Sequence, residues 1–329
     1  MWFLLSSLNK SNKKIIAIVF VLFICSIFSS VVAFANVKPK EENKKQVKYS
    51  YSLYRLNNVY DPDSAIYKKS ENVNYGTIVK DLKYFSPEAN DYKYCNVLLP
   101  AGYSKNKTYP VLYVIHGWHG NHSNQIDDDS YLQILYGNML DLGRAKPMII
   151  VNVDMYTDKI SEKEEITKDD VKLKASYAKI SDDIVHNVMP LIEKTYPVKT
   201  GRNNTAIAGV SHGGTNALIA AFKYTDKFAY VASFAPDPGV IPTEFRKDTY
   251  VNSPVLDDFR ILNIVEQFKY LYLAVGGDDP ENIDPTLYYG EVLKLKGIKN
   301  RTDFVEGMPH NPSFWRLCFN NYLNKLFRD

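Results

Sequence analysis

The stretch TAIAGVSHGG at residues 205–214 decides the fold of this chain. Its first six residues form an apolar run that suits a strand buried on both faces, and a helical pattern follows over residues 213–223. Between them lies G-x-S-x-G with Ser211 at its centre. A strand, a sharp glycine-flanked turn and a helix in this order form a nucleophile elbow, which raises a serine hydroxyl above the edge of a sheet. We therefore predict that Ser211 is a nucleophile; the structural alternative is a tight turn whose serine only caps the helix.

Other strand and helix patterns alternate on both sides of this stretch. Strands are expected at 76–86, 92–99, 109–115, 148–153, 205–210, 230–235, 270–276 and 302–306, and helices at 181–196, 213–223, 285–296 and 313–327. Pro190 falls inside the first helix and predicts a kink there. Such alternation indicates an α/β protein with a mostly parallel central sheet and helices on both faces. Ligands bind such sheets at the carboxyl ends of the strands, which is where chemistry is expected.

A serine nucleophile needs a base, and the base needs an orienting acid. After Ser211 the only histidines are its neighbour His212 and His310, which lies in a loop between the last strand and the last helix. His310 is therefore the expected base. For the acid, Asp278 and Asp279 both follow the strand at 270–276. We favour Asp279, with Asp278 second, and a third candidate, Asp237, follows the strand at 230–235.

Acyl transfer also requires two hydrogen-bond donors for the developing oxyanion. One is expected to be the backbone N–H of His212, the residue after the nucleophile. The other is expected from the loop HGWHG at 116–120, where the N–H of Trp118 is the candidate. His116 is expected to hold this loop through hydrogen bonds of its ring.

The same loop permits a metal-site hypothesis. His116, His119 and His122 recur every three residues, and three aspartates follow at 127–129. Glycines between the histidines argue against a helix, so the spacing does not bring the three rings to one face. We expect neither a catalytic metal nor a cofactor.

Residues 1–35 are typical of a signal peptide. Three lysines precede an apolar run from Ile15, and the stretch ends in an A-x-A cleavage site, Ala33-Phe34-Ala35. The alternative is an uncleaved membrane anchor over residues 15–35, facing outward, and that is the only membrane contact we expect. The formal charge of +3 comes from those three lysines, so the rest of the chain is near neutral and carries no basic footprint for nucleic acid. We expect a secreted, extracellular protein.

The remaining chain is expected to have two parts. Residues 36–75 form a solvated spacer followed by an extended arm, and residues 76–329 form one catalytic domain. Its two cysteines, Cys95 and Cys318, both sit in apolar stretches, which favours two buried free thiols over a disulfide.

From about Gly76 to Phe327 the chain resembles carbohydrate esterase family one, the esterase D group, and within it bacterial feruloyl esterase domains. The motifs that carry the resemblance are LPAGY at 99–103, YPVLY at 109–113 with His116-Gly117 and Gly120, PLIE at 190–193 with Tyr196, AIAG at 206–209 with Ser211, DKFAY at 226–230, Gly276 with Asp279, His310 and Trp315. The resemblance implies an α/β-hydrolase fold. It also implies that Ser211, Asp279 and His310 are nucleophile, acid and base, and the spacing from Gly276 favours Asp279 over Asp278. We expect Trp315 and Asp237 to line the substrate site.

The implied activity is hydrolysis of a feruloyl or acetyl ester on plant cell-wall polysaccharide such as xylan, which makes an ester substrate the expected partner. Two alternatives stay open: an acyltransferase of the same fold, and a carbohydrate-binding protein without activity. The chain departs from the family pattern at His212, where methionine is common, and in a long charged segment over 157–179. We expect that segment to stay out of the core, either as a mobile flap over the cleft or as a solvated loop without contact to substrate.

Overall fold

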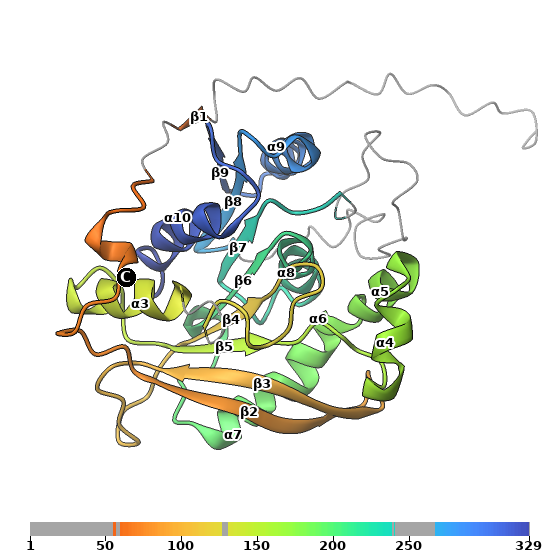
Figure 1. Cartoon of the computed structure of the whole chain (residues 1–329), viewed down its shortest axis with the longest axis horizontal. Coiled ribbons are helices and arrows are strands. Elements are labelled where there is room, and N and C mark those ends of the chain that lie inside the picture. Colours follow the sequence, from red (N-terminus) through yellow and green to blue (C-terminus); the bar gives the residue numbers. More distant parts are fainter. Residues whose placement is uncertain (1–54, 57–59, 127–130, 239, 241–266, 329) are drawn as a thin grey trace, which may run out of the picture. The chain divides into compact units, whose positions relative to one another are not determined.

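The computed structural model describes residues 55–56, 60–126, 131–238, 240 and 267–328, all within one compact unit, Val47–Asp329. Nine strands form one sheet in the order β1-β9-β8-β7-β6-β4-β5-β3-β2 (Figure 1). The strands are β1 Arg55–Leu56, β2 Thr77–Ser86, β3 Asp91–Leu99, β4 Val111–Ile115, β5 Ile149–Val153, β6 Thr205–Val210, β7 Tyr230–Phe234, β8 Tyr270–Gly276 and β9 Arg301–Val305. Strands β4 to β9 and β1 pair in parallel, while β3 joins β5 and β2 joins β3 in antiparallel fashion.

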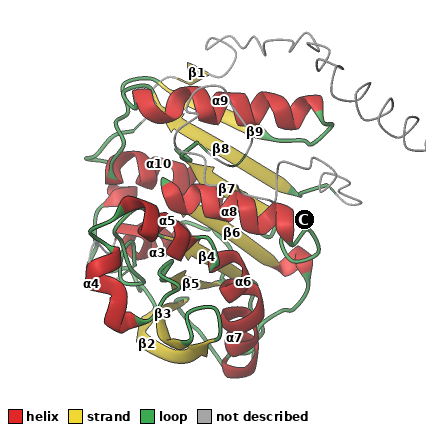
Figure 2. Ribbon diagram, turned by 90° about the vertical axis from the view of Figure 1, so that its right-hand side faces the viewer, coloured by secondary structure: helices red, strands yellow, loops and turns green. Residues whose placement is uncertain are grey.

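Helices cover both faces of this sheet, which confirms the predicted α/β class. The longer helical elements are α3 Tyr131–Asp141, α4 Lys163–Ile166, α5 Asp170–Tyr177, α6 Ile180–Asp183, a π-helical turn Ile184–Val188, α7 Met189–Thr195, α8 His212–Lys223, α9 Pro280–Leu295 and α10 Pro312–Leu323. Short 3-10 turns lie at Ala65–Tyr67, Ile160–Glu162 and Arg202–Asn204. Figure 2 shows α8 and α9 lying along the strands. The predicted strands match within two residues, whereas α3 has no counterpart among the predicted elements and α9 begins five residues before its predicted start.

The two cores follow from alternation along the central strands. In β4, Val111, Tyr113 and Ile115 point into one apolar cluster, and Leu112 and Val114 point into the other. The first cluster is closed by α5 to α8 and the second by α3 and α10. A strand buried on both faces therefore reads as a continuous apolar run, as the sequence indicated.

The helix around Pro190 is interrupted, as its proline predicted, but by a widened turn. Five residues of π-helix, Ile184–Val188, precede α7, and Pro190 occupies the first turn of that helix. A proline has no N–H to donate, so a turn with longer hydrogen-bond spacing accommodates it without a broken helix.

Residues 60–75 lie against α3. The Asn138 side chain donates hydrogen bonds to the backbone carbonyls of Ala65, Ile66 and Lys68, and it accepts one from the Tyr75 hydroxyl. The two cysteines lie on opposite sides of the sheet: Cys95 belongs to the first cluster and Cys318 to the second. Both are fully buried and free, which confirms the expected free thiols.

Candidate active site

Ser211 sits in a turn that only glycine neighbours permit. It has φ 55° and ψ −128°, a conformation that non-glycine residues rarely adopt, and its N–H donates to the Phe234 carbonyl at 2.7 Å. A Cβ on Gly209 would lie 2.0 Å from the Gly213 carbonyl oxygen, and a Cβ on Gly213 would lie 2.1 Å from the His116 carbonyl oxygen. The backbone therefore closes tightly around the serine, as expected for an elbow between β6 and α8.

The structure brings Ser211, His310 and Asp279 together from the loops after β6, β9 and β8. The Ser211 Oγ lies 2.9 Å from Nε2 of His310, and Nδ1 of His310 lies 2.7 Å from a carboxylate oxygen of Asp279. These distances suit donation from the hydroxyl to Nε2 and from Nδ1–H to the carboxylate. The three groups form one hydrogen-bonded chain that can carry a proton away from the serine oxygen.

Burial separates the two aspartates that follow β8. The Asp279 side chain is buried, whereas Asp278 is exposed and no hydrogen bond joins its side chain to His310 within the described residues. Asp237, the third acid candidate, binds elsewhere: its carboxylate lies 2.9 Å from Nδ1 of His212. Of the three acids, Asp279 is the one that contacts His310.

Asn282 is a member of this site that the sequence reasoning missed. It is buried in the first turn of α9, and its side-chain N–H₂ donates to both Asp279 oxygens at 3.0 and 3.2 Å. These bonds fix the carboxylate that faces His310. Asn282 follows Asp279 by three residues in the sequence. That spacing indicates a contact only if α9 begins at Pro280, and the sequence pattern placed the start of this helix later.

The loop after β4 passes directly over the nucleophile. A Cβ on Gly117 would lie 3.4 Å from the Ser211 Cβ, so this glycine allows close approach. In the described part of the chain the backbone N–H groups of Trp118 and His212 have no hydrogen-bond acceptor. An oxyanion hole requires two such free donors near the nucleophile, and these two belong to the residues that follow Gly117 and Ser211.

Buried side chains hold this loop in place. The Nε2 of His116 accepts from the Met155 N–H at 2.9 Å, so Nδ1 carries the proton and donates to the Gly117 carbonyl at 2.6 Å. The side chain of Asn152, in β5, donates to the His122 carbonyl at 3.0 Å and also to the Asn124 carbonyl. The expected structural role of His116 is thus confirmed.

The histidines of the metal-site hypothesis have separate surroundings. His116 is occupied by backbone groups, His119 is exposed, and His122 lies 2.8 Å from Asp81 and 3.8 Å from Asp154. Burial lowers the pKa of His122, but the two carboxylates outweigh it and raise the pKa overall. Over the residues the structure places, no group of three or more His, Cys, Asp or Glu side chains is arranged to hold a metal ion. The acidic triplet at 127–129 lies outside them.

A cleft of about 510 Å³ opens beside Ser211 and His310. Polar groups of Asn121, Asn124 and Gln125 line one part of it, and Trp315 lines another. Trp315 is 7% exposed and its ring packs edge-on against His310 with centroids 4.8 Å apart. Trp315 therefore braces the histidine as well as bordering the cleft.

The charged segment at 157–179 differs from the expectation. It folds into short helices, and Leu173, Ser176 and Tyr177 are buried. The Tyr177 ring lies 5.5 Å from that of Trp118 and 5.6 Å from that of His212. The expectation that this segment stays out of the core was wrong, because charged residues occupy its outer face and a short apolar stripe anchors its inner face.

Comparisons with known proteins concern the family and the fold of this chain. A family model described as "Putative esterase" matches residues 86–276. A xylanase/feruloyl esterase from Xylanibacter ruminicola is 24% identical over 81% of this chain, which spans 33% of that protein. A ferulic acid esterase of carbohydrate esterase family one from Anaeromyces mucronatus, solved alone and with ferulic acid, superposes with a TM-score of 0.71 at 29% identity. That alignment covers 81% of this chain and 96% of the fungal structure solved alone.

A third similar structure is a feruloyl esterase module from Clostridium thermocellum complexed with sinapinate. It has a TM-score of 0.64 at 18% identity, with 85% of this chain and 97% of the module covered. At that identity the likeness concerns the fold alone.

Proposed function

The chain belongs to the esterase family whose model spans residues 86–276, and we propose that it is a secreted serine esterase acting on plant cell-wall polysaccharide. The membership makes it a carboxylic-ester hydrolase of the α/β-hydrolase fold, as its resemblance to carbohydrate esterase family one indicated. The catalytic residues, the substrate and the location go beyond what the family membership gives. The esters in question are feruloyl or acetyl groups on a polysaccharide such as xylan, and the names of the similar enzymes above support the feruloyl choice.

The observation that carries the mechanism is the hydrogen-bonded chain Ser211–His310–Asp279. Ser211 Oγ attacks the ester carbonyl while Nε2 of His310 takes its proton, and Asp279 stabilises the imidazolium. The N–H groups of His212 and Trp118 hold the oxyanion. His310 returns the proton to the leaving alcohol, the C–O bond breaks, and an acyl-enzyme remains on Ser211.

Water completes the cycle. It attacks the acyl carbonyl as His310 takes its proton, and collapse of the second tetrahedral intermediate releases the free acid and restores the Ser211 hydroxyl. The groups that act in these two half-reactions are side chains and backbone of the chain itself.

The location rests on residues 1–35, whose basic start, apolar run and A-x-A site are those of a signal peptide. They lie outside the described residues. Among the residues the structure describes, none of the helices has the length and apolarity to span a membrane. Mass spectrometry of the protein exported from its host tests the cleavage after Ala35.

One panel tests the activity and its substrate. The protein is assayed on methyl ferulate, acetylated xylan and short p-nitrophenyl esters, with Ser211→Ala as control and a fluorophosphonate probe to label the nucleophile. We expect labelling at Ser211 and release of ferulate or acetate. A protein that is not labelled and releases neither acid would be a binding module, and ester formation on an added sugar alcohol in place of acid release would indicate an acyltransferase.

A further inference from the structure

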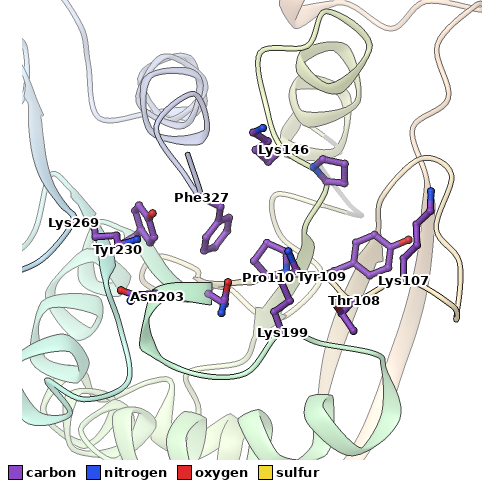
Figure 3. Close-up of a pocket in the computed structure, with 12 residues that line it drawn as sticks. Lys107, Thr108, Tyr109, Pro110, Lys146, Lys199, Asn203, Tyr230, Lys269 and Phe327 are labelled. Atoms are coloured by element: carbon purple, nitrogen blue, oxygen red, sulfur yellow. The ribbon is translucent and has the colours of Figure 1, made fainter. Parts of the chain in front are cut away.

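A second cavity, of about 480 Å³, lies at the opposite edge of the sheet from Ser211 (Figure 3). Its lining comes from the segments that precede β4, β5, β6 and β8, from the first residue of β7, Tyr230, and from Phe327 after α10. Ser211 instead follows the carboxyl end of β6, and a six-residue strand is about 20 Å long. The cavity is therefore separate from the proposed catalytic cleft.

Positive charge without compensation distinguishes this cavity. It is lined by the exposed residues Lys107, Lys146, Lys199 and Lys269, and none of the lining residues that the structure describes is acidic. Within the described part of the chain, none of these four ammonium groups has an ion-pair or hydrogen-bond partner. Lysines elsewhere commonly do, as Lys93 and Lys223 show with their aspartates. Four unpaired cations around one hollow favour an anionic ligand.

An aromatic ring stands at the centre of the same hollow. Phe327 projects into it between Lys146 and Lys199 (Figure 3) and is half-buried, packed at 5.0 Å on the Tyr230 ring. Its φ of 55° is unusual for a bulky residue, and such conformations persist where the surroundings hold them and often where a ligand binds. A half-buried ring in a hollow that is also lined by polar side chains such as Asn203 suits a sugar, whose C–H face stacks and whose hydroxyls hydrogen-bond.

The arrangement of the lysines selects among anions. Figure 3 places Lys107 and Lys269 at opposite ends of the hollow, so the cations do not converge on one point. Among the described residues that line it there is no arginine to bind a compact phosphate bidentately. A single-stranded nucleic acid would use several stacking rings in succession. Of the aromatic residues that line the described part of the hollow, Tyr109 and Tyr230 are only 4% and 3% exposed, and Phe327 is half-buried. Charges spaced along an extended chain of sugars fit better.

We propose that this cavity binds a segment of acidic polysaccharide, with uronate carboxylates paired to the four lysines and one sugar ring against Phe327. The site would work without the catalytic residues, so the proposal does not rest on the esterase function. In an enzyme acting on plant polysaccharide it would retain the polymer at one edge of the sheet while ester groups are cleaved at the other.

The test uses the full chain with Ser211→Ala, so that no turnover occurs and failure of this proposal is distinguishable from failure of the catalytic one. Binding of tetragalacturonate is measured by calorimetry and compared with the same oligomer whose carboxyls are methyl-esterified. We expect the acidic oligomer to bind more tightly and its binding to weaken at high salt. The added change Lys199→Ala/Lys269→Ala should weaken it about tenfold, the loss of two ion pairs.

The matched control is Lys83→Ala/Lys172→Ala, which removes the same charge from β2 and α5 and should leave binding unchanged. Phe327→Ala should weaken both oligomers alike. Equal binding of the esterified oligomer, or no effect of the Lys199/Lys269 change, would overturn the proposal. Tighter binding of inorganic phosphate or of a single-stranded oligonucleotide than of tetragalacturonate would overturn it too, in favour of a phosphate site.

Discussion

The Nε2 of His310 lies 2.9 Å from the Oγ of Ser211, although 99 residues separate them in the sequence. The contact exists because β6 and β9 belong to the parallel part of one sheet, so the loops that follow their carboxyl ends lie along the same edge. Chain order is nucleophile, acid, base, and each contributes from a different strand. Activity therefore depends on the loops that follow the carboxyl ends of β6, β8 and β9.

Replacing Ser211 with alanine should abolish turnover. The hydrogen-bonded set acts as a unit, so loss of its nucleophile lowers kcat by on the order of 10⁶-fold. The fold should persist, because the hydroxyl has no part in either core. Hydrolysis of a p-nitrophenyl ester and a thermal melt measure the two effects, and substantial remaining esterase activity would exclude the serine mechanism.

The two aspartates after β8 should behave differently. Asp279→Asn retains the shape of the side chain but no longer orients the His310 ring correctly, and kcat should fall by about 10⁴-fold. Asp278→Asn should change kcat little, because that side chain is exposed and away from the ring. Steady-state kinetics on one small ester decide the matter; the reverse ranking would mean that Asp278 is the acid.

Asn282→Ala should lower kcat about 10- to 100-fold without a large change in KM. The side chain holds both oxygens of Asp279, and a hydrogen bond to a charged group contributes about 1.5–3 kcal/mol. Glu281→Ala, in the same helical turn but exposed, is the control. If both variants retain full kcat, the Asp279 carboxylate does not depend on Asn282 for its position.

Tyr177→Leu should reduce kcat on small and polymeric esters alike. Its ring packs against Trp118 and His212, whose backbone N–H groups are the proposed oxyanion donors. Because a leucine would pack less well there, both donors should shift, and every ester substrate needs these donors. Val171→Ala, on the exposed face of the same helix, should have no effect. A loss confined to KM for polysaccharide would instead indicate that α5 acts as a rim for the polymer.

The buried ion pair Lys93–Asp183 predicts an acid-sensitive stability. Their charged atoms lie 2.5 Å apart and both side chains are buried. Burial raises the pKa of Asp183, but Lys93 and the neighbouring donors outweigh it and lower the pKa overall. Because the pKa of Asp183 is lower in the folded protein than in the unfolded chain, where it is about 3.9, its ionised carboxylate stabilises the fold above that pH. The stabilisation is lost as pH falls through the pKa that Asp183 has in the folded protein.

Asp183→Asn should therefore lower the free energy of unfolding by about 3–5 kcal/mol at pH 7, because Lys93 is left buried without its partner. The gap to the unmutated protein should narrow as pH falls below about 4. Replacing both residues with apolar ones should restore much of the loss. Urea titrations at pH 7 and below pH 4 measure the free energy of unfolding of both proteins. A difference between them that does not change with pH would show that the Lys93–Asp183 ion pair does not cause it.

The sequence was informative wherever a strand led directly into a special turn. Strand β6 and the nucleophile Ser211 could be predicted from the single stretch 205–214, because its glycines indicate a tight turn between a strand and a helix. Strand β4 could be predicted from its unbroken apolar run. The α5 segment was misjudged because its average composition is charged, while three inward-facing residues, Leu173, Ser176 and Tyr177, decide its burial. The average composition of a segment does not reveal so short a buried face.

Asn282 shows a different limit. Its role depends on a helix that begins at Pro280, and the sequence pattern indicated a start only at Pro285. Asp279, by contrast, was favoured over Asp278 from the sequence, but only through the family resemblance, because a local pattern does not show which of two adjacent side chains turns inward. Such details follow from three-dimensional packing more than from local pattern.

The two cysteines of the esterase domain have a practical consequence for labelling chemistry. Cys95 and Cys318 are fully buried, and burial raises the pKa of Cys95 to about 12 and that of Cys318 well above its usual value. A thiol of that kind supplies almost no thiolate to a maleimide at neutral pH. In protein cleaved after Ala35, which lacks Cys25, one cysteine introduced on the surface would therefore be the single reactive thiol, so a fluorophore could be attached beside either edge of the sheet without first removing the native cysteines.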